Sequence, residues 1–339
     1  MKLSVPVLTT AVSKTLQNRG VSVATADSVA EALVDADAAG VASHGVIQLR
    51  RYLDALEDGE VLANAQVSVR RSFASASLVS GGWGFGQPAM DYGTQLACRT
   101  ADRNGIGLVS VVECYHTGRL GRYVEEAARL GYLMAIFGGG QGAVEPHAAP
   151  YGGRTRVLHT NPVAFGVPAG PSGPWVVDFA TTVVSGGALM SALQDGRQLP
   201  PGSLVGPDGE PSSDPNVFFE GGAHAPFGGH KGYGLMLFAE AVSNILSDAR
   251  GYASPPLGGI YLGESATTII AIPSGVFGEV VDFSSTSEEL AEKIRNSTPA
   301  SGFDRVRVPG DLENDARRRS ESGLEVADDV ATILRPHLE

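Results

Sequence analysis

Glycine is the residue that most constrains how this chain can fold. The 339-residue sequence contains 44 glycines, and most of them lie in its middle, between short runs rich in β-branched residues. Runs at 108–112, 175–177 and 267–272 have the length of buried strands, and the glycines between them favour turns. Helices are expected between these strands, at about 88–104, 120–130 and 233–246. The middle of the chain is therefore predicted to consist of strands, loops and a few helices.

The first 60 residues have the periodicity of amphipathic helices. Leu8, Val12 and Leu16 recur every four residues, which predicts the first helix. A second helix is expected to begin from a cap at Thr25, and a third is expected to end at Gly59.

The C-terminal part is also predicted to be helical. Thr286 and Glu289 form an expected capping box for a helix that carries Leu290 and Ile294. A last amphipathic stretch has apolar residues at a spacing of four: Val326, Val330 and Leu334. We therefore expect an α+β fold in which helices from both termini join as a smaller domain. The predicted boundaries are 1–80 with 284–339 for the helical domain, and 81–283 for the α+β domain.

Composition excludes several classes of function. The 37 acidic and 25 basic residues give a formal net charge of −12, and such a surface repels the phosphate backbone of nucleic acids. Two cysteines, Cys98 and Cys114, are too few for a disulfide framework. No apolar stretch approaches the roughly 20 residues of a membrane helix, and no signal-peptide core is visible. We expect a cytoplasmic protein with no nucleic-acid or membrane partner.

The sequence lacks the standard motifs for nucleotides and metals. Gly82, Gly84 and Gly86 resemble the opening of a dinucleotide-binding loop, but Gln87 stands where the third glycine belongs, and no strong parallel strand leads in. The histidines lack the spacing of zinc ligands, and no GxSxG nucleophile motif occurs. We therefore expect no metal, and a nucleotide must bind outside a standard Rossmann unit.

Four polar residues are the best candidates for a reaction site. His44 lies in Ala-Ser-His-Gly and His116 follows the strand at 108–112; histidine titrates near neutral pH and can donate a proton at a carbonyl oxygen. Lys231 begins an apolar helix, where a cation is disfavoured unless it meets an anion. Asp178 ends a buried strand, where a carboxylate is costly unless it is paired. Turn, surface or loop-capping roles stay open as alternatives for these residues when each is taken alone.

Several ordered motifs together carry a resemblance to a known family. They are Ser43-His44-Gly45-Val46 followed by Tyr52, His116 with Gly118, Thr160-Asn161-Pro162, Asp178-Phe179-Ala180-Thr181, Gly229-His230-Lys231-Gly232 and Pro309-Gly310-Asp311. In this order, from about residue 8 to residue 334, they resemble the type-2 malate/L-lactate dehydrogenases. One such motif alone would be weak, but coincidence of this many is improbable.

The resemblance implies an NAD(P)H-dependent oxidoreductase, usually a homodimer, whose α+β domain is a non-Rossmann NAD(P)-binding domain. The family reduces small 2-keto acids, diketo sugar acids or cyclic 2-imino acids, or oxidises the matching hydroxy and amino acids. The resemblance implies that His44 is the proton donor and that Asp178 acts with it. Expected substrate contacts come from Ser43, Gln48, Tyr52 and His116. Expected cofactor contacts come from Thr160, Asn161, Pro162, Asp178, Phe179, Ala180, Thr181, Lys231, Gly232, Gly310 and Asp311.

The chain departs from the family pattern near the expected substrate. Ala42 replaces an aspartate, and Gln48 replaces an arginine that would bind a substrate carboxylate. Arg50, two residues on, would point away on a helix. A glutamine loses a charge-assisted contact worth about 1.5 to 3 kcal/mol, which suggests an altered substrate. Tyr115, in an unusual stretch before His116, would narrow the pocket or supply a hydroxyl donor.

Three alternatives stay open at the level of sequence. Ketone and imine substrates need the same hydride geometry and proton source, so the motifs do not separate them. NADH and NADPH are not distinguished, because no ribose-binding acid can be assigned outside a Rossmann unit. The alternative function is a non-catalytic nucleotide-binding or sensor protein that retains the dehydrogenase fold; Gln48 and Ala42 favour it, whereas His44, Asp178 and Lys231 oppose it.

Overall fold

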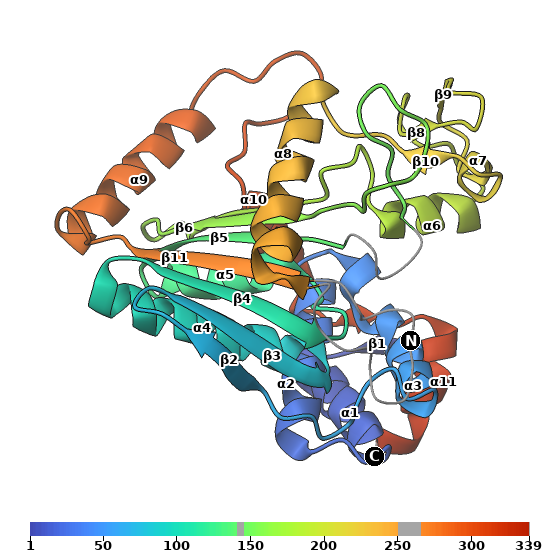
Figure 1. The fold of residues 1–339 in the computed structure, drawn as a ribbon, viewed down its shortest axis with the longest axis horizontal. Coiled ribbons are helices and arrows are strands. Elements are labelled where there is room, and N and C mark those ends of the chain that lie inside the picture. Colours follow the sequence, from blue (N-terminus) through green and yellow to red (C-terminus); the bar gives the residue numbers. More distant parts are fainter. Residues whose placement is uncertain (141–145, 250–265, 339) are drawn as a thin grey trace.

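A mixed β-sheet with helices on both faces forms the centre of the protein (Figure 1). The computed structural model describes residues 1–140, 146–249 and 266–338. A group of helices that includes both termini lies at one end of this mixed α/β fold, at the lower right of Figure 1. No helix among the described residues has the length and apolar character needed to cross a membrane.

The central sheet has seven strands in the order β2-β3-β4-β11-β5-β6-β7. Their bounds are β2 Ser68–Ser72, β3 Ala76–Gly84, β4 Gly107–Cys114, β5 Tyr132–Gly138, β6 Val163–Val167, β7 Trp175–Phe179 and β11 Ala266–Pro273. Among these strands only β3 and β4 pair in parallel; the other neighbours are antiparallel. The strands predicted at 108–112, 175–177 and 267–272 are confirmed as parts of β4, β7 and β11.

The expectation that no strong parallel strand leads into the glycine-rich turn is wrong. Strand β3 runs directly into helix α4 (Gly86–Asn104) and lies parallel to β4. Its small residues, Ser77, Ser80 and Gly81, conceal the strand pattern in the sequence. A Cβ at Gly86 would collide with the backbone carbonyls of Tyr115 and His116. The chain itself therefore covers the start of α4, where a Rossmann unit would hold a phosphate.

Alternate residues of the central strands face different helices. Ile136 and Ile269 pack with α4 and α5 (Leu120–Arg129), whereas their neighbours Phe137 and Ile270 pack with α8 (His230–Glu240). This is the alternation of a sheet buried on both sides. Helix α8 continues as a π-helical turn over residues Ala241–Ile245.

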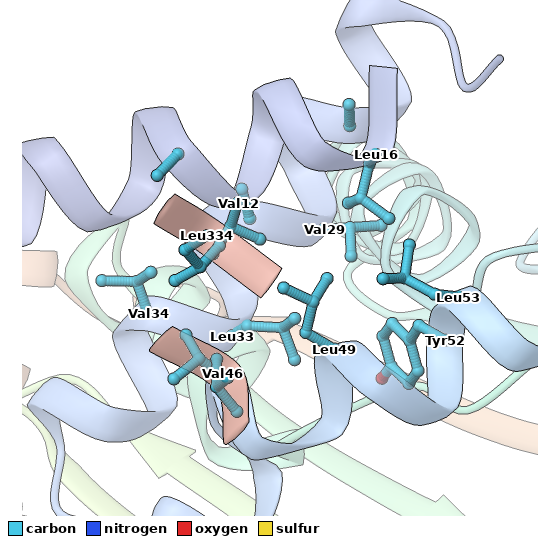
Figure 2. Packing of buried hydrophobic residues seen from close by; sticks show 14 of the residues in the cluster. Val12, Leu16, Val29, Leu33, Val34, Val46, Leu49, Tyr52, Leu53 and Leu334 are labelled. Atoms are coloured by element: carbon cyan, nitrogen blue, oxygen red, sulfur yellow. The ribbon is translucent and has the colours of Figure 1, made fainter. Parts of the chain in front are cut away.

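The helical group combines segments from the two ends of the sequence. It contains α1 (Val5–Gln17), α2 (Val23–Ala38), α3 (Leu49–Glu57) and α11 (Asp328–Leu334). Figure 2 shows Leu334 beside Val12 and Leu33 in one buried cluster. Strand β1 (Lys2–Leu3) also pairs with β12 (Leu324–Glu325). The domain boundaries stay a prediction, and β2 and most of β3, within residues 1–80, belong to the central sheet.

Two predicted helix caps are wrong. Helix α2 begins at Val23 and is capped by Ser22, whose side chain accepts a hydrogen bond from the Thr25 N–H. Helix α9 (Val280–Arg295) begins well before Thr286, so the predicted capping box lies inside it. Its buried residues are Ser287 and Ala291, whereas Leu290 is 47% exposed. Leu290 therefore lies off the packed face of this helix, whereas Ile294 is half-buried.

Several short elements complete the fold. The remaining helices are α6 (Gly186–Gln194), α7 (Asn216–Phe219) and α10 (Asp311–Ser320), with 3₁₀ turns at Ala42–His44, Val46–Gln48 and Arg335–His337. A small antiparallel sheet contains β8 (Leu204–Val205), β9 (Pro211–Ser212) and β10 (Ala223–His224). Helix α10 is strongly polar and is anchored by ion pairs, including Arg317 with Glu125 and Asp35.

Candidate active site

The His44 segment is a tight double turn supported by a buried carboxylate. Two 3₁₀ turns, Ala42–His44 and Val46–Gln48, connect α2 to α3. Oδ2 of Asp37 accepts a hydrogen bond from the Val46 N–H at 2.9 Å. A side chain at Gly45 would collide with the same carboxylate. Asp37 therefore fixes the turn that carries His44, and glycine at 45 allows the approach.

Burial raises the pKa of Asp37 from its ordinary value near 3.8 to about 6, although the Val46 N–H opposes the shift. A carboxyl with a raised pKa binds its proton more tightly in the folded state. Its contribution to stability is therefore fully present below roughly pH 4 and is lost as the pH rises through about 6. Ionised Asp37 costs folding free energy at neutral pH.

The Asp37→Asn variant is expected to be more stable than the wild type at pH 8, by about 1 to 3 kcal/mol, and nearly equal to it at pH 4. The amide oxygen still accepts from Val46, but the buried charge is gone. Urea denaturation at the two pH values measures the difference in free energy of unfolding. Asp58→Asn, at an exposed residue after α3, is the control. An advantage of Asp37→Asn that does not change with pH would contradict the assignment.

The two candidate histidines lie face to face. The rings of His44 and His116 are stacked with centroids 5.5 Å apart. Nδ1 of His44 lies 3.0 Å from the Ser43 hydroxyl, whereas its Nε2 has no hydrogen-bond partner among the described residues. Burial lowers the pKa of both imidazoles, and the charge of Arg51 lowers both further. The structure therefore brings His44 and His116 together, whereas their roles stay predictions.

Tyr52 and His116 are joined directly. The Tyr52 hydroxyl lies 2.8 Å from Nδ1 of His116, and Nε2 of Gln87 donates to the same hydroxyl at 2.8 Å. Tyr52 and Gln87 are fully buried. The ring of Tyr115 packs against that of Tyr52 at 5.6 Å.

Gln48 is tied into the turn by its amide group. Its Nε2 donates to the Ser43 carbonyl at 2.7 Å, and its Oε1 accepts from Nη1 of Arg51 at 3.3 Å. Arg51 also donates to the Tyr115 hydroxyl at 3.2 Å and lies over that ring. Arg50 is exposed and faces Asp54, as its helical position predicts. A guanidinium is therefore held close to Gln48, but it comes from position 51.

Asp178 belongs to β7, and its carboxylate lies against the start of α5. Its Oδ2 accepts from the Gly121 N–H at 2.6 Å. Burial raises the pKa of Asp178, although this hydrogen bond and the charge of Arg119 oppose the rise. Asp178 makes no hydrogen bond to His44 in the described part of the chain, so their joint action stays a prediction. Helix α6, which follows the Asp178 segment in the sequence, approaches the His44 turn, because a Cβ at Gly187 would lie 2.6 Å from that of Ser43.

Arg119 connects the two residues electrostatically. Its charge lowers the pKa of His44 as well as opposing the raised pKa of Asp178. The side chain is almost completely buried, and Nη1 contacts Asp35 at 3.1 Å and Glu125 at 3.7 Å. Asp35 belongs to α2, so this network also ties the His44 segment to the central sheet domain.

The predicted cofactor segments form a second cluster. The N–H and hydroxyl of Thr181 donate to the Thr160 carbonyl at 2.8 and 2.9 Å, and the hydroxyl also reaches the Asn161 carbonyl at 3.0 Å. Pro162 accepts from the Gly138 N–H at 2.8 Å. The ring of Phe179 packs on that of Phe227, with the ring centroids 5.4 Å apart. Ala180 connects Phe179 to Thr181. The structure thus joins Thr160–Pro162 with Phe179–Thr181.

A buried carboxylate holds this cluster together. Glu240 of α8 accepts from Nδ2 of Asn161 at 2.7 Å, from Nδ2 of Asn244 at 3.0 Å and from the Gly140 N–H at 3.2 Å. Asn161 is fully buried and has a positive φ of 37°. Glu240 therefore satisfies three buried donors and fixes a strained turn.

The start of α8 is suited to an anion. Gly228 and Gly229 have positive φ angles of 58° and 63°, and among the described residues no side chain caps the helix. Lys231 in the first turn is exposed. Gly232 packs against the Phe227 carbonyl, so tightly that a side chain there would collide. The N–H groups at a helix start with a lysine in its first turn suit a phosphate or carboxylate. Phe227, which contacts Gly232, also packs on Phe179 and so connects this helix start to the cluster of Thr160–Pro162 and Phe179–Thr181.

Gly310 and Asp311 lie at the other end of β7. The Pro309 carbonyl accepts from the Val176 N–H at 3.2 Å, and a side chain at Gly310 would press on the Pro174 carbonyl. The Asp311 carboxylate binds Arg295 at 2.8 Å and the Val308 N–H at 2.9 Å. These contacts are internal, and no contact with the Thr160 cluster is present among the described residues.

Sequence reasoning missed several supporting residues, among them Asp37, Gln87 and Arg119. Asp37 fixes the turn that carries His44, and Gln87 donates a hydrogen bond to Tyr52. The charge of Arg119 opposes the rise in the pKa of Asp178 that burial causes. Their partners are distant in sequence or lie across a turn, so no spacing pattern marks them. In the described chain, no three His, Cys, Asp or Glu side chains gather as a metal site would require.

Comparison with known proteins gives one consistent result. The sequence pattern of the malate/L-lactate dehydrogenase family matches residues 3–335. The L-sulfolactate dehydrogenase of Methanocaldococcus jannaschii is 31% identical over 328 residues, 94% of this chain and 91% of that protein. The Δ1-pyrroline-2-carboxylate reductase of Ancylobacter novellus is 33% identical, over 90% and 88% of the chains. The structure of the M. jannaschii sulfolactate dehydrogenase superposes with a TM-score of 0.88 at 29% identity, covering 99% and 96%.

Proposed function

The chain belongs to the malate/L-lactate dehydrogenase family and is an enzyme, and from this premise we propose that it is an NAD(P)H-dependent oxidoreductase for a small 2-keto or 2-hydroxy acid or a cyclic imine. The observation that carries the proposal is the stacked pair of His44 and His116. One imidazole has a nitrogen without a partner among the described residues, and the other is held by Tyr52. Such a pair can deliver one proton and orient one substrate.

His44 is the proposed proton donor. When a reduced nicotinamide is bound, it supplies a hydride to the carbonyl or imine carbon of the substrate. The oxygen or nitrogen of that double bond then gains charge, and Nε2–H of His44 gives it a proton. Ser43 at Nδ1 orients the ring, and Asp178 with Arg119 sets the local charge. In the opposite direction, neutral His44 takes the proton from the hydroxyl or amine.

The proposed cofactor site is the cluster around Thr160–Pro162 and Phe179–Thr181 with the start of α8. The polar backbone of these segments and the uncapped helix with Lys231 suit a nucleotide phosphate. Asp178 lies one residue before Phe179, so one strand end serves both the cofactor segment and the proposed reaction site. Gly310 and Asp311 are proposed to contribute from the other end of β7. This arrangement is a non-Rossmann NAD(P)-binding domain.

The proposed substrate lies among Ser43, Gln48, Tyr52 and His116. The relatives named above act on an L-sulfolactate and on a cyclic imino acid, so both kinds of substrate are compatible with this fold. Arg51 partly replaces the charge that Gln48 lacks. We also propose a cytoplasmic homodimer; apolar residues of the α8 region such as Phe238 and Ile245, 55% and 68% exposed, support an interface there.

A binding titration followed by a substrate panel tests the proposal. NADH and NADPH are titrated into the purified protein, and the tighter one is offered with 2-keto acids, Δ1-piperideine-2-carboxylate and Δ1-pyrroline-2-carboxylate. Oxidation of the nicotinamide with at least one of them is expected, and the preferred class separates ketone from imine reduction. Binding of the nucleotide without reduction or oxidation of any substrate would instead support a nucleotide-dependent sensor. Absence of binding would contradict both functions.

A further inference from the structure

A fully buried glutamine lies behind the two histidines. Gln87, in the first turn of α4, donates from Nε2 to the Tyr52 hydroxyl at 2.8 Å. That hydroxyl lies 2.8 Å from Nδ1 of His116. Residues from α3, α4 and the loop after β4 therefore form a continuous chain of hydrogen bonds that ends on an imidazole of the proposed site.

The chemistry of these groups favours one direction for the chain. An amide nitrogen has two hydrogens and no acceptor capacity, so the Tyr52 oxygen accepts from Gln87. The phenol oxygen has room to accept a second hydrogen bond, so the 2.8 Å contact with Nδ1 of His116 fits either direction; when the phenol donates, its own hydrogen has an acceptor in this network. Nδ1 of a neutral imidazole accepts such a bond only when the ring proton is on Nε2.

We propose that Gln87 is a positioning residue that acts through Tyr52 to fix His116 as a neutral imidazole with its proton on Nε2. This proton donates a hydrogen bond to an oxygen of the substrate. The inference rests on the proposed function for the identity of the site and narrows its substrate. The group that faces His116 is a hydrogen-bond acceptor, such as a carboxylate, carbonyl or hydroxyl oxygen, and not a cation.

The surroundings of His116 support a neutral ring. Burial lowers its pKa well below 6.5, and the charges of His44 and Arg51 act in the same direction. No carboxylate forms a hydrogen bond with His116 in the described part of the chain. The pKa of His116 is lowered well below its ordinary value, whereas that of His44 is lowered less, so an extra proton on the stacked pair favours His44. The two histidines then have different roles: His44 donates a proton, and His116 donates only a hydrogen bond.

Gln87 is poorly explained by stability alone. Its Oε1 is buried and has no hydrogen-bond partner among the described residues. An unpartnered buried oxygen costs free energy, so an apolar side chain of similar size would serve a purely structural role at least as well. Gly118 leaves room for the amide, because a Cβ there would lie 3.3 Å from Nε2 of Gln87. The loop that carries His116 therefore accommodates this amide.

Nitrogen NMR of the protein labelled with ¹⁵N-histidine tests the proposal without any turnover. The spectra of the wild type and of His116→Gln identify the His116 signals. The wild type is expected to show one tautomer, with a protonated Nε2 and an unprotonated Nδ1. Gln87→Leu is expected to show a mixture of tautomers. Its kcat/KM should fall about tenfold, while the affinity for NADH or NADPH stays unchanged.

Matched variants separate this role from general packing. Tyr52→Phe removes the connecting hydroxyl and should give the same mixture of tautomers. Thr94→Val changes another buried polar residue of α4 and should leave the His116 signals unchanged. If Gln87→Leu does not fold, the wild type and Tyr52→Phe still decide the question.

Two results would overturn the proposal. A wild-type signal with the proton on Nδ1 would mean that the chain of hydrogen bonds runs the other way. An unchanged single tautomer in both Gln87→Leu and Tyr52→Phe would mean that neither residue sets it. Failure of every substrate in the panel would overturn the proposed function, whereas the tautomer of His116 is measured independently.

Discussion

Replacing His44 with alanine is expected to lower kcat/KM for reduction at least about a hundredfold, the low end of general-acid contributions. The imidazole is the proposed proton source at the reacting double bond, and stacked His116 is held neutral by burial. The affinity for the nicotinamide should change little, because the proposed cofactor cluster lies on other segments. Steady-state kinetics and a binding titration measure the two quantities separately.

The pH profile gives a second readout for His44. Burial and the charges of Arg119 and Arg51 hold its pKa below the ordinary value of 6.5. Reduction needs the protonated ring, so kcat/KM of the wild type should fall as the pH rises through that pKa. The dependence should be absent in His44→Ala. His337→Ala, which removes a histidine near the C-terminus, is the control; unchanged turnover in His44→Ala would remove this residue from the mechanism.

Glu240→Ala is expected to reduce the free energy of unfolding by about 3 to 5 kcal/mol. It removes the carboxylate oxygens that accept from the side chains of Asn161 and Asn244 and from the Gly140 N–H, all of which are buried. Urea denaturation measures the loss. If the folded variant is obtained, its KM for NADH or NADPH should also rise, because Asn161 lies in the turn proposed to contact the cofactor.

Two further variants serve as comparisons for the loss in free energy of unfolding caused by Glu240→Ala. Glu240→Gln keeps one oxygen and should lose less stability than alanine. Glu57→Ala removes a carboxylate that is 76% exposed and lies 3.9 Å from Arg19, so its effect should stay within about 0.5 kcal/mol. A loss below about 1 kcal/mol for Glu240→Ala would show that the three donors find other partners.

The sequence predicted those parts of the fold where apolar spacing is strong. Leu8, Val12 and Leu16 lie on the packed face of α1, and the β-branched runs are strands. Helix α10 escaped prediction because it has almost no apolar residues and is held by ion pairs such as Arg317 with Glu125. Helix α6 begins with two glycines, and only the Ser185 cap marks its start. Charge pairs and caps between distant residues leave no periodic signal.

The candidate site was predictable as a set of residues but not as a network. Motif order pointed to His44, His116 and Tyr52, and the structure places them in contact. The same motifs did not indicate Gln87, which entered only as a departure from a glycine fingerprint. Its role depends on α3 and α4 meeting beneath the His116 loop, which is a tertiary contact. Arg51 was missed for the same reason, since its guanidinium reaches Gln48 and Tyr115 at once.

The pairing of β1 with β12 has a consequence for synthesis on the ribosome. Leu3 pairs with Leu324, and the cluster beneath the His44 turn includes Leu334. Translation proceeds at about 5 to 20 residues per second. Helices α1, α2 and α3 therefore leave the ribosome on the order of tens of seconds before their C-terminal partners are synthesised. During that interval their apolar faces are uncovered, so the nascent chain is a natural client for chaperones that bind exposed hydrophobic segments.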